Sequence, residues 1–223
     1  MGFPHSQSGL IFETLFGTGF IARVCYHKLI NPKEVIPMNQ KVSTKRIVLA
    51  ALMAALTVVG SAIRITIPVD IGGTTAFHLG NIMCALSGLL LGPGLGGVAA
   101  GLGSAIYDMM NPAYISEAWL TFLMKGAYGL MAGLVAWMGK KHWGYIKAIL
   151  ASFAGALTYA MLYLGKTYLK AVFVQGVAPA AGLIAVAGKV PATIFNAVVA
   201  IIFAPMLGMA IRKALEKNHL TLE

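Results

Sequence analysis

The chain has 223 residues, of which 58% are hydrophobic and only 11% are charged, and its mean hydropathy is +0.79. A soluble domain of this length needs more charged surface, and several apolar runs approach the roughly 20 residues that a helix needs to cross a bilayer. The composition therefore excludes an ordinary soluble protein. The runs are rich in Ala, Leu, Gly and Met and do not alternate, so the expected fold class is an all-α membrane protein rather than a membrane barrel.

The formal net charge of +10 does not indicate a nucleic-acid partner. The basic residues cluster between the apolar runs and do not form a stripe with interleaved aromatic residues. They fit better as signals for membrane orientation. The two cysteines, Cys25 and Cys84, are too few for a disulfide framework.

The first 37 residues differ from the rest of the chain. Their weak apolar run at 10–22 is interrupted by a glutamate and two glycines, which suits neither a signal peptide nor a membrane span. Met38 is followed by a polar, basic segment and a clean apolar run. We therefore expect residues 1–37 to be a leader that is poorly ordered or absent from the native chain. Residues 38–217 are expected to form the membrane domain, and residues 218–223 a cytoplasmic tail.

The first expected span runs from about Arg46 to Ile63. It carries two overlapping pairs of alanines on one face, and small residues four apart let another helix approach closely in lipid. Packing within the bundle and docking of a partner protein explain these pairs equally well. The candidate docking residues are Ala50, Ala51, Ala54 and Ala55.

The connection from Arg64 to Ala76 alternates branched apolar residues with others and contains the Gly72-Gly73 turn signal. This pattern predicts an extended flap.

Five further spans complete a predicted bundle of six transmembrane helices. The second and third, at 77–91 and 94–109, are short and rich in glycine, which predicts a tight hairpin with Pro93 in its turn or, alternatively, a re-entrant hairpin. Residues 171–188, broken by glycine and proline, are expected to form a partly embedded connection that serves as a lid, or else an additional span. The remaining expected spans are 118–138, 146–164 and 189–211.

Orientation is predicted from the basic residues beside the spans, because cytoplasmic loops retain them. With six crossings, nine basic residues gather on one side, whereas the other side has Arg64, Lys166 and Lys170. Both termini are therefore expected in the cytoplasm.

Polar side chains gather at the outer ends of several expected spans, where burial in lipid requires a partner or a function. Each has a structural alternative: Lys125 could snorkel, His78 could cap a helix, and Asp108 could pair with a lysine inside the bundle. Asn81 and Asn196 are stronger candidates, because an unpaired amide within a span is penalised. The candidate substrate-binding residues are His78, Asn81, Asp108, Asn111, Tyr114, Lys125, Tyr163, Lys189 and Asn196.

Motifs for enzymatic chemistry are absent from the sequence. It has no HExxH pair, no nucleophile elbow, no paired-cysteine motif and no Walker A loop. We therefore expect no metal site, no cofactor and no enzymatic activity, and favour transport or binding of a small polar molecule.

The order of these features resembles the substrate-binding S component of energy-coupling factor (ECF) vitamin transporters, over residues 38–217. It most resembles the branch that handles hydroxymethylpyrimidine, pyridoxine or pantothenate. The alanine-rich first helix and a glycine-rich run ending at Asp108 contribute to the likeness. The other motifs that carry it are Phe77-His78-Leu79-Gly80-Asn81, Gly92-Pro93, Asn111-Pro112, Tyr114, Thr121-Phe122, Lys125-Gly126, Ala132-Gly133, Lys189-Val190-Pro191 and Asn196.

The resemblance implies a six-helix protein in the plasma membrane of a prokaryote that captures a vitamin at the extracellular side, with the first connection as a gate. The alanine pairs would dock on a transmembrane T subunit that couples two cytosolic ATPases, so ATP hydrolysis is expected on other chains.

The ligand and two other classes of function stay open. Lys125 and Lys189 would suit a carboxylate such as that of pantothenate, whereas Asp108 with Asn81 and stacking tyrosines would suit a pyrimidine or pyridine ring. A stand-alone secondary transporter and a non-transport membrane scaffold are the alternatives to an ECF subunit.

Overall fold

The computed structural model describes residues 43–69, 73–138 and 143–218. The expectations for residues 1–37 and for the tail beyond Asn218 lie outside these described residues. Within them the chain forms six α-helices, a two-stranded sheet and two short helical turns. The helices are α3 (Thr44–Ala62), α4 (Gly80–Leu91), α5 (Pro93–Met109), α6 (Ala118–Trp137), α7 (Tyr145–Leu169) and α8 (Pro179–Lys217). The turns are the 3₁₀ turn η1 (Ile115–Glu117) and the π-helical turn η2 (Lys170–Val174).

Four helical segments are long and apolar enough to cross a membrane: α3, α6 with η1, α7 with η2, and α8. Helix α4 is apolar but shorter. The predicted class, a multi-pass membrane protein built from α-helices, is confirmed. The second and third predicted spans correspond to α4 and α5, which have only 12 and 17 residues.

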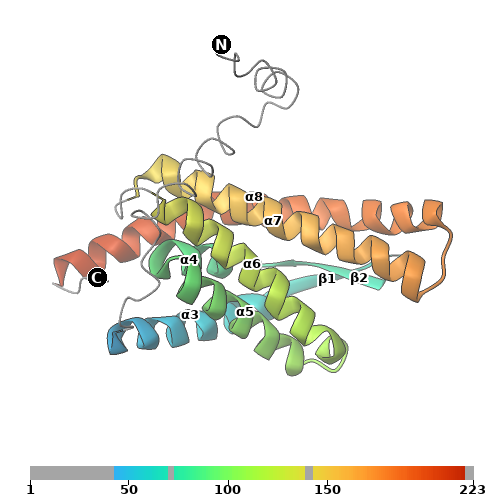
Figure 1. Ribbon diagram of the computed structural model, residues 1–223, viewed down its shortest axis with the longest axis horizontal. Coiled ribbons are helices and arrows are strands. Elements are labelled where there is room, and N and C mark those ends of the chain that lie inside the picture. Colours follow the sequence, from blue (N-terminus) through green and yellow to red (C-terminus); the bar gives the residue numbers. More distant parts are fainter. Residues whose placement is uncertain (1–42, 70–72, 139–142, 219–223) are drawn as a thin grey trace, which may run out of the picture. The chain divides into compact units, whose positions relative to one another are not determined.

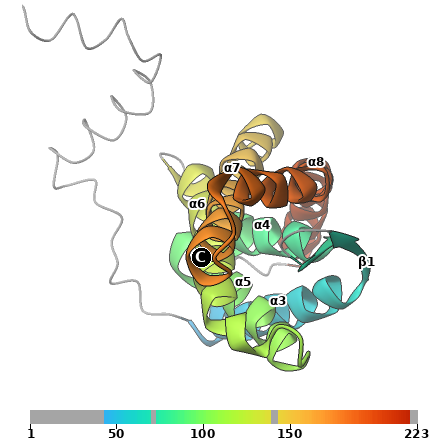
Figure 2. The same ribbon diagram turned by 90° about the vertical axis from the view of Figure 1, so that its right-hand side faces the viewer.

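Helix α4 lies at the centre of the bundle. The other five helices pack in the order α3, α5, α6, α7, α8, each against the next, and every one of them contacts α4 (Figures 1 and 2). Nearly all of α4 is buried, and its leucines form much of the core. A central helix can be this apolar on all sides because none of its faces meets water.

The buried carboxyl end of α4 has its free carbonyls satisfied by side chains. The indole N–H groups of Trp137 and Trp143 both donate to the Leu89 carbonyl at 3.0 Å. The Arg46 guanidinium donates to the Leu91 carbonyl at 2.8 Å. These bonds replace the water that would otherwise solvate a helix end, and the guanidinium also complements the helix dipole.

Glycines set the close approach of α4, α5 and α6. A Cβ at Gly88 of α4 would lie 2.4 Å from the Gly129 carbonyl oxygen of α6, and one at Gly96 of α5 would lie 2.5 Å from the Ser87 carbonyl oxygen. Gly92, at φ +80°, ends α4 directly before Pro93 opens α5. The predicted tight hairpin with Pro93 in its turn is confirmed.

The predicted flap is a β-hairpin. Strands β1 (Arg64–Val69) and β2 (Gly73–His78) are antiparallel, with Arg64 opposite His78 and Val69 opposite Gly73. β2 contacts both α3 and α8, and it meets α8 at Phe195 and Asn196, near the middle of that helix. The prediction that the second span starts at Phe77 is wrong, because Phe77 and His78 pair with β1 and the helix begins only at Gly80.

The last helix begins ten residues before the predicted Lys189. The 39 residues of α8 span about 58 Å at 1.5 Å per residue. Pro179 holds the first position of α8, where its missing N–H is not needed, and Pro191 lies inside the helix. A proline within a membrane helix is tolerated where neighbours compensate for its lost hydrogen bond. The predicted connection 171–188 is therefore wrong beyond residue 178, and η2 with the residues up to 178 contains no additional span.

Candidate functional site

A cavity of about 280 Å³ lies at the end of the bundle that carries the β-hairpin, which we call the hairpin end. Its volume is at the lower limit of ligand cavities, which favours a small ligand. Both strands, η1, η2 and five of the six α-helices contribute side chains. The charged and aromatic lining residues are Arg64, His78, Tyr107, Asp108, Tyr114, Glu117, Lys125, Tyr159, Tyr163, Lys166, Lys170 and Lys189.

Seven of the nine predicted substrate-binding residues line this cavity: His78, Asp108, Tyr114, Lys125, Tyr163, Lys189 and Asn196. The other two do not. Asn111 lies in the loop after α5, where its Oδ1 accepts the Ala113 N–H at 3.1 Å. Asn81 lies in the core beneath the cavity and is 2% exposed.

Asn81 does not line the cavity but binds Lys125, which does. The Lys125 ammonium donates a hydrogen bond to the Asn81 side-chain oxygen and lies 4.1 Å from the centre of the Tyr159 ring. Lys125 is only 4% exposed, so it does not snorkel to the membrane surface. The amide and the ring face both stabilise the buried cation.

Three tyrosines form a stack along one side of the site. The Tyr128 and Tyr159 ring centres are 5.9 Å apart, and those of Tyr159 and Tyr163 are 5.6 Å apart, with planes inclined by 26° and 16°. Tyr159 and Tyr163 are one turn apart on α7, which aligns them. Tyr163 ends the stack in the cavity lining, where an aromatic ring is a surface for a flat ligand.

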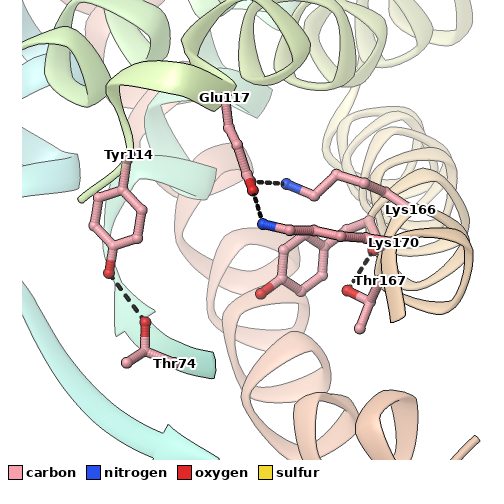
Figure 3. A network of polar contacts seen from close by, with 7 residues as sticks. Thr74, Tyr114, Glu117, Lys166, Thr167 and Lys170 are labelled. Atoms are coloured by element: carbon pink, nitrogen blue, oxygen red, sulfur yellow. Dashed lines mark hydrogen bonds and ion pairs between the residues drawn. The ribbon is translucent and has the colours of Figure 1, made fainter. Parts of the chain in front are cut away.

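Arg64, which the sequence analysis did not propose as a site residue, joins the hairpin to α5 and its following loop. Its guanidinium donates to the Tyr107 hydroxyl at 3.2 Å and to the Tyr114 hydroxyl at 3.0 Å. Tyr114 also shares a 3.2 Å hydrogen bond with Thr74 of β2 (Figure 3). Tyr114 therefore helps to hold the hairpin over the cavity.

Glu117 is a second lining residue that the sequence analysis did not propose. Figure 3 shows its carboxylate between the ammonium groups of Lys166 and Lys170, both from the α7–η2 segment. The Lys166 contact is 2.6 Å long. Lys166 and Lys170 are spaced i,i+4, a sequence signal that both ammonium groups lie on one helix face.

Asn196 binds the backbone of the hairpin through both ends of its amide. Its Oδ1 accepts the backbone N–H of His78 at 3.0 Å, and its Nδ2 donates to the Ala76 carbonyl at 2.8 Å. The adjacent Phe195 packs edge-on against Phe77, with ring centres 4.9 Å apart. This part of α8 therefore holds β2 against the bundle.

His78 both caps a helix and lines the cavity. Its Nδ1 accepts the Gly80 N–H at the start of α4 at 3.2 Å. Burial, with the nearby positive charges of Lys125 and Arg64, lowers the pKa of the His78 imidazole well below its ordinary value. The ring is therefore neutral at physiological pH, and the bond to Nδ1 assigns the proton to Nε2.

Asp108 and Lys189 are not paired with each other or with Lys125. Asp108 accepts a hydrogen bond from Thr121, and within residues 43–69, 73–138 and 143–218 no ion pair to its carboxylate is formed. Lys189 is 8% exposed and lies 5.6 Å from the centre of the Tyr163 ring. The alternative that Asp108 merely neutralises a lysine in the bundle is therefore wrong for the described residues.

The four alanines of α3 divide between two environments. Ala50 and Ala54 are half-buried, and a Cβ at Gly103 of α5 would lie 2.3 Å from the Ala54 carbonyl oxygen. Ala51 and Ala55 are exposed. Ala54 therefore packs within the bundle, whereas the small side chains of Ala51 and Ala55 point outward.

Comparison with known proteins supports the expected ECF S component, but not the branch for hydroxymethylpyrimidine, pyridoxine or pantothenate. A family model described as "ECF-type riboflavin transporter, S component" matches residues 41–213. A protein of Pyrococcus woesei described as "Uncharacterized protein in gap 3'region" is 33% identical over 114 residues, which are 51% of this chain and 72% of that protein. No solved structure matches the chain.

Proposed function

We propose, from the premise that this chain belongs to the family of S components of ECF-type riboflavin transporters, that it captures a small water-soluble vitamin in the cavity at the hairpin end. It then delivers this vitamin across the membrane as one subunit of an importer. The family consists of substrate-binding subunits for vitamin uptake, and its members are transporter subunits rather than enzymes.

The observation that supports this proposal best is the character of the cavity. It is small, part of its lining comes from a hairpin that Asn196 and Tyr114 hold in place, and ionisable side chains of membrane-length helices line the rest. Ionisable side chains within a membrane bundle are costly and mark ligand pathways by default. A compact pocket with a few convergent polar groups is the usual form of a small-molecule site.

The proposed orientation places the hairpin end outside the cell. The opposite end of the bundle carries Arg46, Lys147, Arg212, Lys213 and Lys217, and cytoplasmic ends of membrane proteins are enriched in such residues. The vitamin would then enter the cavity from the extracellular side of a prokaryotic plasma membrane.

The candidate vitamins are riboflavin, which the family description names, and hydroxymethylpyrimidine, pyridoxine and pantothenate, which the sequence motifs suggest. Riboflavin, hydroxymethylpyrimidine and pyridoxine have flat rings, for which the exposed end of the stack at Tyr163 offers a surface.

The proposed partners are a transmembrane T subunit and two ATPases that hydrolyse ATP. The exposed Ala51 and Ala55 are the proposed contact with the T subunit, because their small side chains permit close helix packing. Ala50 and Ala54, which were equal candidates in the sequence, serve packing against the bundle.

Isothermal titration of the purified full chain with these four vitamins tests the proposal. We expect one of them to bind with a Kd below about 1 μM, equivalent to about −8 kcal/mol. No heat of binding and no shift of the unfolding temperature with any of them would contradict it. Uptake by proteoliposomes that contain this chain alone would instead indicate a stand-alone secondary transporter.

A further inference from the structure

Lys189 is a largely buried lysine that forms no ion pair within the described part of the protein. It lies ten residues into α8, is 8% exposed and lines the cavity. The Lys189 ammonium lies over the Tyr163 ring, 5.6 Å from the ring centre.

The charges around Lys189 leave an excess of positive charge. Its electrostatic neighbours are Lys166, Lys170 and Glu117. The Glu117 carboxylate is already shared by Lys166 and Lys170. In this corner of the cavity, three ammonium groups therefore face one carboxylate among the described residues.

Asp108, the second acidic residue in the cavity lining, does not neutralise the excess positive charge near Lys189. Among the described residues Asp108 forms no ion pair with Lys189, and its carboxylate accepts a hydrogen bond from Thr121. Over the whole lining, five Lys and Arg side chains face two carboxylates, and His78 is neutral.

A structural role does not explain an ammonium in this position. A snorkelling lysine extends its charge to the lipid–water boundary, but the Lys189 ammonium lies beside the Tyr163 ring in the cavity lining. Removing an ammonium group from water without an anion or acceptor is strongly unfavourable. A negative group that enters the cavity would supply the missing counter-ion.

We infer that the ligand of this cavity carries a carboxylate or a phosphate, and that Lys189 binds this anionic group. The inference rests on the proposed function and narrows its substrate class. Lys166 and Lys189 lie 5.8 Å and 5.6 Å from the centre of the Tyr163 ring. A ligand packed against this ring therefore has both ammonium groups within reach of an acidic substituent.

Matched pairs of acidic and neutral ligands test this inference on the purified full chain. Suitable pairs are pantothenate with panthenol, nicotinate with nicotinamide, and riboflavin 5′-phosphate with riboflavin. In the pair that binds, the acidic member is expected to bind at least about tenfold more tightly at low salt, and this preference should weaken as salt screens the charges.

The variant Lys189→Met removes the charge and keeps an unbranched side chain of similar length. It is expected to weaken binding of the acidic member by about 10- to 100-fold, as loss of a charge-assisted bond does, and to leave the neutral member unchanged. Without ligand, the variant should unfold at a higher temperature than the wild type, because the uncompensated cation is gone. Lys213→Met, an exposed residue at the opposite end of the bundle, is the control and should change neither quantity.

The outcomes distinguish the inference from the proposed function. Neutral members that bind as tightly as their acidic partners to the wild type would overturn the inference and leave vitamin capture intact. If the Lys189→Met protein does not fold, the comparison of acidic and neutral ligands on the wild type still tests whether the ligand is anionic. Absence of binding by every compound would overturn the proposed function, and the inference with it.

Discussion

Asn196 of α8 is hydrogen-bonded to the backbone of His78 in β2, with its Oδ1 3.0 Å from the His78 nitrogen. The same amide donates to the Ala76 carbonyl two residues earlier. One side chain thus occupies a backbone donor and a backbone acceptor of a strand that lines the cavity. The position of β2 over the cavity therefore depends on α8.

The variant Asn196→Leu is expected to loosen the hairpin while the bundle stays folded. It leaves the His78 N–H and the Ala76 carbonyl without partners, at a cost of about 1–3 kcal/mol for each buried group. Hydrogen exchange of the amides in residues 73–78 should become faster than in the wild type, and the unfolding temperature should fall. Val198→Ala, at an exposed position nearby on α8, is the matched control. Unchanged exchange in β2 would show that Asn196 does not hold the hairpin.

Lys125 and Asn81 are expected to be energetically coupled. Replacement of Asn81 by Leu leaves the buried ammonium of Lys125 without its amide acceptor, and hydrogen bonds to charged groups are worth about 1.5–3 kcal/mol. Lys125→Met should remove much of that penalty when both changes are combined. Thermal or denaturant unfolding of both single variants and the double variant measures the coupling energy, expected between about 0.5 and 3 kcal/mol. Simple additivity would mean that the two side chains act independently.

The sequence predicted the residues whose burial is costly, but not their partners. Asp108, Lys125 and Lys189 were found because an ionisable group in an apolar run requires an explanation. Asn81 and Asn196 were predicted as ligand contacts for the same reason, yet the structure pairs them with Lys125 and with β2. The partners in these two hydrogen bonds are separated by 44 and 118 positions in the sequence. Such contacts are set by helix packing, so the local sequence around either residue carries no sign of them.

Arg64 and Glu117 could not be recognised as cavity residues from the sequence. Both lie outside the predicted membrane spans, in segments where a charged side chain is common. Their importance depends on partners brought in by α5 and α7. Helix boundaries failed where local signals were ambiguous. A proline such as Pro191 is common in the first turn of a helix, but it is also tolerated inside a membrane helix where neighbours replace its lost hydrogen bond. The sequence does not distinguish these two placements. Phe77 continues an apolar run, and only its pairing with Ile65 identifies it as a strand residue.

His78 is expected to make stability depend on pH. Its pKa is lowered in the folded protein by burial and by Lys125 and Arg64, whereas the unfolded chain has the ordinary value of about 6.5. The unfolded state therefore binds the proton more readily, and the contribution present above pH 6.5 is lost as the pH falls below it. Unfolding temperatures at pH 7.5 and 5.5 should differ less for His78→Gln than for the wild type. The other histidines are common to both proteins, so equal differences would contradict a neutral, buried His78.

The exposed alanines of α3 are expected to govern assembly without affecting capture. Replacing Ala51 and Ala55 by Phe places bulk on the outward face, so co-purification with a T subunit should be lost while vitamin affinity is retained. Phe at Val198, an exposed position on α8, is the control for added bulk and should leave the complex intact. If the Ala51 and Ala55 substitutions also leave the complex intact, the docking face lies elsewhere.

Mass spectrometry of the small molecules released on unfolding is the sharpest test of vitamin capture in this cavity. The purified protein is incubated with the vitamin panel and its acidic and neutral analogues, washed, and then denatured. We expect release of one vitamin at close to one molecule per chain, and little or none from a Thr121→Trp variant, in which the indole fills the cavity beside Asp108. No retained molecule, or equal retention by the wild type and Thr121→Trp, would contradict vitamin capture in this cavity.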